Sequence, residues 1–373
     1  MSGTILLTGA SGFLGMEILT RLLDRDEERI AVLIRAEDDD AARQRLTAVL
    51  DRLYDRPPPA AARVRVVRGD MQQPGLGLSN SDRLRLCDSV DRIIHCAASI
   101  SFDQPLPRAR DTNVEGVRRI IELAREIAET GHLRRLMHVS TAYVAGHHNG
   151  TFGETDLYYG QRFRNSYEQS KNEAERLLNE AGDLPTVIAR PSMVVGHQAC
   201  GWTAAFNVIY WPIRAYERGL LREIPARPDS IVDFVPVDYV ASAVEALLDD
   251  DEATGAYNLV AGARSLSASG LLELLASLPR SGSGRPPDAR LVEPRDGAAL
   301  PPGAETLLSY FDVRCHFDDH RAGTVLERAG VERPDPRSYL PQLMSYARIT
   351  AWGKRPISRQ ASLIAARPAV SAP

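Results

Sequence analysis

Short apolar runs alternate with helical stretches through the first half of the chain, and this alternation limits the fold more than any other feature. The runs are TILLTG from Thr4, RIAVLIR from Arg29, RVRVVRGD from Arg63, DRIIHCAA from Asp91, RLMHVS from Arg135 and TVIARP from Thr186. Apolar runs without strict alternation are typical of strands buried on both faces of a parallel sheet. Helical stretches such as GFLGMEILTRLLDR separate them. The sequence therefore predicts an α/β fold with a doubly wound parallel sheet.

The second half of the chain is less regular. An aromatic stretch begins at Gly201, VPVDYVASAVEALL resumes the end of a strand and a helix, and AYNLV at Ala256 predicts one more strand. Residues 279–303 are rich in Pro, Gly, Ser and Arg, which is typical of a long loop. We expect the sheet domain at 1–196, completed by about 232–262, a smaller C-terminal substrate lobe made of 197–231 and 263–352, and a disordered tail at 353–373.

The composition excludes several classes of protein. A hydrophobic content of 44% and a charged content of 25% are typical of a globular protein. The net charge of -4 gives no excess of positive charge that would attract nucleic acid or an anionic membrane. The four cysteines form no CxxC, and HFDDH, with His316 and His320, has no cluster of further ligands, so we expect no disulfide framework and no metal site. We find no signal peptide and no apolar run of about 18 residues, and expect a cytoplasmic protein without a membrane span.

The stretch TGASGFLG places Gly9, Gly12 and Gly15 between the first strand and the first helix. Glycines let the backbone turn tightly and approach a pyrophosphate, while the helix N-terminus offers unpaired N–H groups to the phosphates. A glycine triplet alone is a weak signal, but the strand-turn-helix context is the one that dinucleotide binding requires. The sequence therefore predicts a dinucleotide site here.

Arg35 stands 20 residues after Gly15, where NAD-binding proteins carry an acidic residue that binds the ribose hydroxyls. A guanidinium suits a 2′-phosphate, so we expect NADPH, with Arg45 as a second cation. The alternative is that Arg35 is a surface residue beside the acidic run EDDD. Asp70 ends the third strand and faces the adenine in this interpretation.

Tyr167 and Lys171 lie four residues apart in SYEQSKNEAERLL. Helical spacing places both on the apolar side of this segment, with Glu168 among the residues of the solvated side. An inward ammonium needs a partner, and a lysine close to a tyrosine hydroxyl lowers the phenol pKa toward neutral pH and can hold the nicotinamide ribose. A snorkelling lysine beside a core tyrosine is the alternative. Ser140 and Thr141, at the end of the fifth strand, are candidates for a third hydroxyl that fixes the substrate oxygen.

Together these residues resemble the extended short-chain dehydrogenases/reductases, which have a Rossmann fold. The matching pieces are TGASGFLG, RGDM, HCAAS, DTNVEG, VSTAYV, YEQSK and RPSMVVG, in the expected order between Thr4 and Gly196. The resemblance assigns Thr141 to the serine/threonine position, Tyr167 to proton donor, and Lys171 to ribose binding and to lowering the tyrosine pKa. The residues expected to bind the cofactor are Gly9, Ser11, Gly12, Phe13, Leu14, Gly15, Arg35, Arg45, Asp70, Met71, Ala97, Ala98, Ser99, Asn113, Ser140, Tyr167, Lys171, Pro191, Ser192 and Met193.

Within that superfamily the chain looks most like the thioester reductases, meaning the fatty acyl-CoA reductases and the terminal reductase domains of nonribosomal peptide synthetases and carboxylic acid reductases. The resemblance implies a role in natural product biosynthesis: NADPH-dependent reduction of an acyl or peptidyl thioester, linked to CoA or to an acyl carrier protein, to an aldehyde, with further reduction to the alcohol left open. The alternative enzyme is an NADP-dependent dehydrogenase or epimerase that acts on a secondary alcohol or ketone of a sugar, sterol or other small molecule. A non-catalytic NADP(H)-binding regulator would not need Tyr167 and Lys171 together. The aromatic residues from Trp202 to Trp211 are expected in the core of the lobe, with an acyl channel as the alternative.

Overall fold

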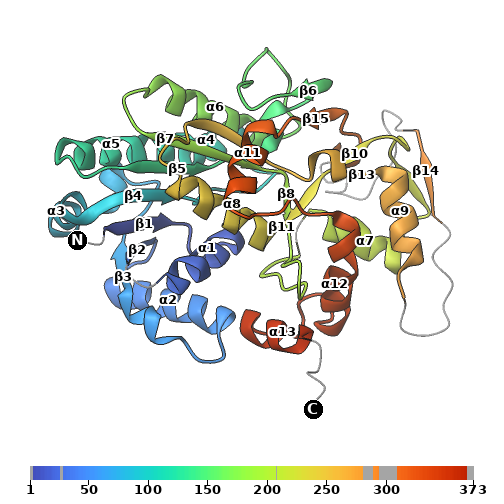
Figure 1. The fold of residues 1–373 in the computed structure, drawn as a ribbon, viewed down its shortest axis with the longest axis horizontal. Helices are drawn as coiled ribbons and strands as arrows, with labels where there is room; N and C mark the ends of the chain where they lie inside the picture. The colour runs from blue at the N-terminus through green and yellow to red at the C-terminus, as the bar shows by residue number, and fades with distance from the viewer. Residues whose placement is uncertain (1–2, 26–27, 207, 280–288, 294–308, 368–373) are drawn as a thin grey trace.

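Seven parallel strands form the centre of the protein, in a computed structural model that describes residues 3–25, 28–206, 208–279, 289–293 and 309–367. Their order is β12-β7-β5-β4-β1-β2-β3 (Figure 1). The strands are β1 (Thr4–Thr8), β2 (Arg29–Ile34), β3 (Val64–Arg68), β4 (Val90–His95), β5 (Arg135–Val139), β7 (Thr186–Pro191) and β12 (Gly255–Leu259). Every residue of β1 and β5 is buried, as expected for a parallel sheet covered on both faces. The predicted doubly wound sheet is confirmed, and AYNLV forms its edge strand β12.

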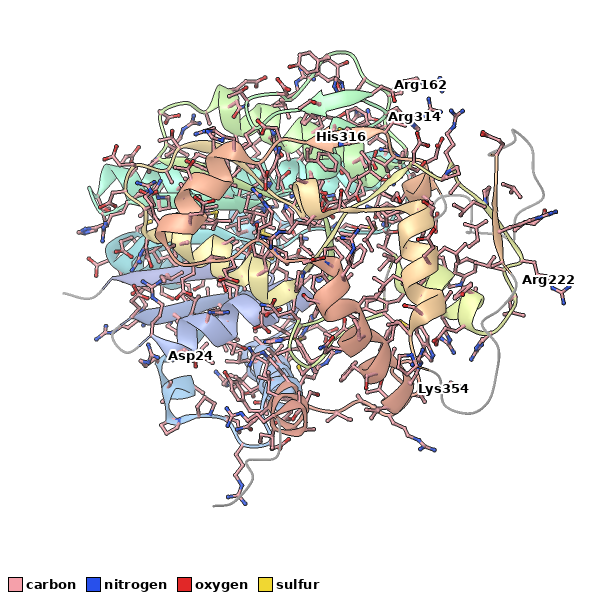
Figure 2. The ribbon with its side chains drawn as sticks, turned by 45° about the vertical axis from the view of Figure 1, so that its right-hand side comes forward. Asp24, Arg162, Arg222, Arg314, His316 and Lys354 are labelled. Carbon is pink, nitrogen blue, oxygen red and sulfur yellow. The ribbon has the colours of Figure 1, made fainter. Side chains whose placement is uncertain are left out.

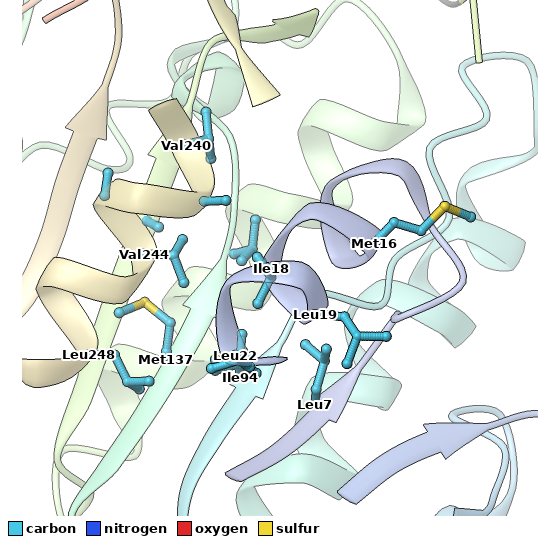
Figure 3. Close-up of a cluster of buried hydrophobic side chains, with 14 of the residues drawn as sticks. Leu7, Met16, Ile18, Leu19, Leu22, Ile94, Met137, Val240, Val244 and Leu248 are labelled. Carbon is cyan, nitrogen blue, oxygen red and sulfur yellow. The ribbon is translucent and has the colours of Figure 1, made fainter. Parts of the chain in front are cut away.

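Helices cover both faces of the sheet. One face packs against α1 (Phe13–Asp24), α2 (Asp39–Leu53), α8 (Val237–Asp249) and α11 (His320–Arg328), and the other against α3 (Asn80–Ser89), α5 (Glu115–Glu129) and α6 (Ser166–Glu180), with α4 (Leu106–Asn113) beside α5 and α6. Figure 3 shows the first of these layers, in which Leu7, Ile94 and Met137 of the strands lie among side chains of α1 and α8. No helix in the described part of the chain is long and apolar enough to cross a membrane.

The strand order reverses direction at β1, which lies between β2 and β4. Ligands of doubly wound sheets bind at such a switch point, outside the carboxyl ends of the strands. The glycine-rich turn after β1, the HCAAS segment after β4 and the Ser140–Thr141 pair after β5 all follow the carboxyl ends of these strands. The fold therefore gathers the predicted motifs at one edge of the sheet.

A second body of secondary structure packs around its own cluster of buried residues at the right-hand side of Figure 1. Its helices are α7 (Tyr210–Glu217), α9 (Ala268–Ser277) and α12 (Pro336–Ile349). Short strand pairs join these elements: β8 (Met193–Val195) with β11 (Phe234–Pro236), β10 (Ile231–Val232) with β13 (Leu266–Ser267), β9 (Glu223–Pro225) with β14 (Arg290–Val292), and β6 (Gly150–Phe152) with β15 (Cys315–Phe317). The 3-10 turns are η1 (Pro59–Arg63), η2 (Pro74–Gly77), η3 (Ala142–Ala145), η4 (Gly262–Arg264) and η5 (Ser309–Phe311).

The expectation of a disordered tail from residue 353 is wrong for helix α13 (Arg359–Ala366). Ser358 caps this helix by accepting a hydrogen bond from Ala361 N. The Arg359 guanidinium forms two hydrogen bonds of 2.6 Å to the carboxylate of Glu17, which is fully buried on α1. The composition of the tail suggested disorder, whereas one cap and one buried ion pair dock it on the sheet domain. Residues 368–373 lie outside the described residues.

Candidate active site

The glycine-rich turn has the geometry of a phosphate cradle. Gly9 has a φ of 78°, and a Cβ there would lie 2.6 Å from Ala97 N, while a Cβ on Gly15 would lie 2.0 Å from Gly9 O. Gly12 is exposed, and the nearest neighbour of a Cβ there would be Gly9 O at 3.2 Å. Gly12 is also the N-cap of α1, and no described side chain caps this helix. The first turn of α1 therefore offers free N–H groups to an anion, so the predicted Ser11, Phe13 and Leu14 lie where a pyrophosphate would fit.

Two exposed arginines meet beyond the carboxyl end of β2, Arg35 directly after the strand and Arg45 on α2. Arg45 Nη1 donates to the backbone oxygen of Arg35 at 2.5 Å, which holds the Arg45 guanidinium at the backbone of Arg35. The neighbouring carboxylates are engaged elsewhere: Asp38 caps α2, Asp39 faces Arg68 at 3.4 Å and Asp40 pairs with Arg43 at 2.5 Å. No ion pair joins Arg35 to Asp38, Asp39 or Asp40 in the described structure.

The segment after β3 is ordered by its own backbone. One carboxylate oxygen of Asp70 accepts from Gln72 N at 3.0 Å, and Asp70 is only partly buried. Met71 is buried, and its backbone oxygen accepts from Arg119. Asp70 thus has a second oxygen available to a ligand, while Met71 would contact one only at the edge of its side chain.

Asn113 is occupied by hydrogen bonds within the protein. Its Oδ1 accepts from Ser99 N at 2.8 Å, and its Nδ2 donates to Ser99 O at 3.0 Å and to Ser170 Oγ at 2.9 Å. The side chain is buried, so it ties the segment after β4, which includes Ala97 and Ala98, to helix α6. We infer that Asn113 positions the site and does not bind the dinucleotide through its amide.

Thr141 and Tyr167 come together, as the sequence predicts. Tyr167 is half-buried, burial raises its pKa, and a side-chain hydrogen bond with Thr141 acts in the opposite direction. Thr141 Oγ1 also accepts from Tyr143 N at 3.2 Å, which fixes the hydroxyl at the start of η3. The hydroxyl of Ser140 is buried and has no partner among the described residues. Of the two candidate hydroxyls, Thr141 is therefore the one beside the tyrosine.

Lys171 does not take the partner that the sequence predicts. Its Nζ donates to Val139 O at 2.7 Å and lies 3.0 Å from His138 Nε2, and it makes no hydrogen bond to Tyr167 in the described structure. Burial lowers the pKa of Lys171 to about 8. The snorkelling alternative is excluded, because the side chain is only 1% exposed. Lys171 is not among the groups that lower the pKa of Tyr167, and burial raises that pKa.

Helix α6 is buried on more than the side that helical periodicity indicates. Glu168, predicted on the solvated side, is fully buried, and so is Glu175 on the same helix. Glu168 accepts from Arg164 N at 3.0 Å, and Glu175 forms a buried ion pair with Arg190 of β7 at 2.6 Å. Because each carboxylate has a buried arginine partner, polarity alone does not mark the exposed side of this helix.

A cluster of aromatic side chains lies beside Tyr167, and it was not predicted from the sequence. The ring centroid of Phe102 lies 5.9 Å from that of Tyr167 and 5.4 Å from that of Tyr310, and Tyr310 packs edge-on against Tyr143 at 4.9 Å. The Tyr310 hydroxyl accepts from Asn165 Nδ2 at 2.9 Å, next to the start of α6. Tyr310 is about 140 residues from Tyr167 in sequence, so no local pattern could have joined them.

The segment Pro191, Ser192 and Met193 is buried behind the site. Pro191 O accepts from Thr141 Oγ1 at 3.4 Å, and Ser192 Oγ donates to Asp233 Oδ1 at 2.5 Å. Burial raises the pKa of Asp233 to about 6. The Ser192 hydroxyl is thus occupied by its hydrogen bond to Asp233. A ligand could therefore contact this segment only through its backbone and through the Met193 side chain.

Trp202 was expected in the core of the lobe, and this expectation is wrong. The indole is buried against the sheet domain, with its ring centroid 5.8 Å from that of Phe13, directly after the glycine-rich turn. Tyr210 is in the core of the lobe, and Phe206 touches both clusters, whereas Trp211 is 37% exposed. The aromatic segment therefore bridges the two bodies, because its first indole finds an apolar partner on α1.

Two further features carry no catalytic assignment. Burial raises the pKa of the Cys96 thiol to about 12, so this cysteine near Lys171 stays protonated and is a poor nucleophile. A cleft of about 670 Å³ lies between α8 and residues 329–338, but Thr141, Tyr167 and Lys171 do not line it. Within the described residues no three His, Cys, Asp or Glu side chains gather as metal ligands.

A family model described as Male sterility protein, which is an NAD-binding domain, matches residues 7–244. Fatty acyl-CoA reductase 1 from Homo sapiens is 31% identical over 275 residues, which are 64% of this chain and 53% of the human protein. The protein of the same name from Mus musculus is 31% identical over 276 residues, with the same coverage. This chain thus spans about half the length of the curated relatives that it matches.

Among solved structures, the terminal R domain from the myxalamid PKS-NRPS biosynthetic pathway superposes with a TM-score of 0.80 at 28% identity, over 96% of this chain and 93% of that one. The R domain of a nonribosomal peptide synthetase from Mycobacterium tuberculosis gives a TM-score of 0.70 at 24% identity, over 95% and 93%. UDP-glucuronic acid 4-epimerase from Bacillus cereus, in complex with NAD, gives 0.68 at 18%, over 95% and 99%, which is a likeness in fold. Because the family model covers more than half of the chain, including the glycine-rich turn and the Thr141, Tyr167 and Lys171 positions, the chain belongs to the Male sterility protein family within the extended short-chain dehydrogenases/reductases.

Proposed function

We propose that the protein is an NADPH-dependent reductase of an acyl or peptidyl thioester, carried on CoA or on a carrier protein, and that it releases an aldehyde. The observation that carries the proposal is the pairing of the Thr141 and Tyr167 hydroxyls beside the buried Lys171, at the sheet edge that also holds the glycine-rich turn. The relatives named fatty acyl-CoA reductase and the R domain of the myxalamid pathway support a thioester as the substrate.

The dinucleotide would lie between the first turn of α1 and the ends of β4 and β5, with Lys171 available to its nicotinamide ribose. When bound there, NADPH supplies a hydride to the substrate carbonyl. Thr141 and Tyr167 then donate hydrogen bonds to the oxygen, where negative charge develops. After the C–H bond has formed, the C–S bond breaks, and one hydride and one proton have converted the thioester into an aldehyde and a free thiol.

The protonation state of Tyr167 favours reduction. Burial raises the pKa of its hydroxyl, so the phenol keeps its proton at neutral pH and can act as donor and acid. Oxidation of a secondary alcohol would instead need a phenolate as base. A protonated phenol suits the reductive direction, for a thioester and for a ketone alike.

Two arginines support NADPH as the cofactor. Arg35 follows β2 and Arg45 of α2 reaches its backbone, both are exposed, and Asp38, Asp39 and Asp40 have other partners. A 2′-phosphate dianion would pair with these guanidinium groups, whereas a ribose hydroxyl would gain little from them.

The test is to incubate the protein with NADPH and a series of acyl-CoA and acyl-pantetheine thioesters, and to measure the oxidation of NADPH and the release of thiol together. We expect both to occur. The ratio of NADPH oxidised to thiol released should be near one if the aldehyde is released and near two if the aldehyde is reduced to the alcohol. Oxidation of secondary alcohols by NADP⁺, without thiol release from any thioester, would contradict the proposal.

A further inference from the structure

Lys171 is held by a histidine that the proposed reaction does not use. Its Nζ lies 3.0 Å from Nε2 of His138, which is on β5 directly below the Ser140–Thr141 pair, and 2.7 Å from Val139 O. His138 and Lys171 are each 1% exposed, so these contacts are shielded from bulk solvent. An ammonium is a donor with no acceptor capacity, and an imidazole can receive its proton only when the ring nitrogen is unprotonated.

A second buried histidine, His95, packs against His138. The ring centroids of His95 and His138 lie 5.2 Å apart, and His95 Nδ1 lies 2.8 Å from Thr8 Oγ1, at the end of β1. Burial lowers the pKa of His95 to about 3 and that of His138 well below its ordinary value, and the charge of Lys171 acts in the same direction on both. Both rings are therefore neutral at pH 7.

The tautomer of His138 follows from its contacts. If Nε2 accepts from Lys171, the ring proton is on Nδ1, which is buried and has no partner among the described residues. No second hydrogen bond then selects this tautomer. The orientation of the neutral ring is set by the lysine on one side and by the His95 ring on the other.

We propose that His138 is a positioning residue for the lysine: its neutral ring accepts a hydrogen bond from Lys171 Nζ and keeps the ammonium charged at the carboxyl end of β5. The value of this for turnover rests on the proposed function, but the interaction itself does not. The other groups that act on Lys171 are Glu175 on α6 and Cys96 after β4, which oppose the effect of burial on its pKa. His138 is the one whose ring nitrogen contacts Nζ directly.

The composition allows a direct test. Of 45 lysines and arginines, only Lys171 and Lys354 are lysines, and Lys354 is exposed at the molecular surface (Figure 2). In protein labelled with ¹³C at lysine Cε, NMR therefore shows two side-chain signals, and Lys171→Arg identifies the one from the site. We expect the Lys171 signal to titrate near pH 8. His138→Leu should move its midpoint down by about one pH unit or more, because a hydrogen bond to the charged form is lost.

Two further variants separate positioning from packing. His138→Gln, whose amide oxygen can accept from Nζ, should restore most of the shift, whereas Met137→Ala, a truncation of a buried side chain on the opposite face of β5, should lower stability and leave the midpoint unchanged. If His138→Leu does not fold, His138→Asn replaces it, because the asparagine side chain is too short for its oxygen to reach Nζ. His138→Asn and His138→Gln then differ in whether Nζ has a side-chain acceptor. An unchanged midpoint in the folded Leu or Asn variant would overturn the inference. Because the titration needs no substrate, its result is independent of whether a thioester is reduced.

Discussion

Removing the Tyr167 hydroxyl is the sharpest test of the assigned chemistry. In Tyr167→Phe the ring can keep its contact with Phe102, 5.9 Å away between centroids, and loses only the hydrogen bond with Thr141. A single hydrogen bond of this kind contributes about 1 kcal/mol to stability, so the variant should fold. The same hydroxyl is one of two donors to the developing oxyanion and the source of the proton. Each of these roles is worth about a hundredfold or more in rate, and they do not add because one group performs both.

We therefore expect kcat for thiol release to fall by about a hundredfold or more, at saturating NADPH and thioester. The affinity for NADPH, measured by fluorescence titration, should be nearly unchanged, because the glycine-rich turn and Lys171 are intact. Tyr158→Phe is the matched control, since that ring is 52% exposed and lies outside the site. A folded Tyr167→Phe protein that retains turnover within about threefold of the parent would refute the catalytic assignment of the tyrosine.

Three further outcomes are expected. Arg35→Ala should remove most of a preference for NADPH over NADH, which an arginine–phosphate pair makes about tenfold to a hundredfold, and equal affinities in the parent protein would show that Arg35 does not reach the phosphate. Glu168→Ala should lower the free energy of unfolding by about 3 kcal/mol or more in chemical denaturation, because it leaves the buried Arg164 guanidinium without its carboxylate partner, whereas Glu180→Ala, at the exposed end of the same helix, should change it by less than about 0.5 kcal/mol. Turnover should fall as the pH rises through about 8, where the pKa of Lys171 predicts loss of the ammonium, and a flat profile between pH 7 and 9 would contradict this.

The sheet could be predicted from the sequence because each of its strands carries its own local signal. Val, Ile and Leu runs such as that of β2 specify a strand buried on both faces, and the spacing of the intervening helices specifies parallel connections. The spacing of the glycines between strand and helix was also a local signal, although what excludes a Cβ at Gly9 is the distant segment Cys96–Ala97 after β4. The strand runs and the glycine spacing can be recognised without information about distant parts of the chain.

The surroundings of the site could not be predicted in the same way. Glu168 is polar and lies on the side of α6 that helical periodicity assigns to solvent, yet Arg164 and the lobe residue Tyr310 bury it. Trp202 packs on Phe13 although 188 residues separate them, which no periodicity reports. Helix α13 is short and has an ordinary composition, and what holds it is the carboxylate of Glu17 on α1. In each case a buried partner far away in sequence decides the position of the residue.

One physical cause explains why Tyr167 and Lys171 both differ from what the sequence predicts. The sequence suggests that Lys171 would lower the pKa of Tyr167, but in the described structure burial disfavours the charged form of each, so the phenol keeps its proton and the lysine pKa falls to about 8. The ammonium then needs an acceptor within the protein, and His138 and Val139 O provide it. A ribose hydroxyl near Nζ would compete for the same donors, so binding of the dinucleotide and the position of Lys171 should be coupled. The Lys171 ¹³C signal should therefore shift on addition of NADP⁺, and the shift should be absent for Lys354; a Lys171 signal that is insensitive to saturating NADP⁺ would show that the lysine does not reach the cofactor.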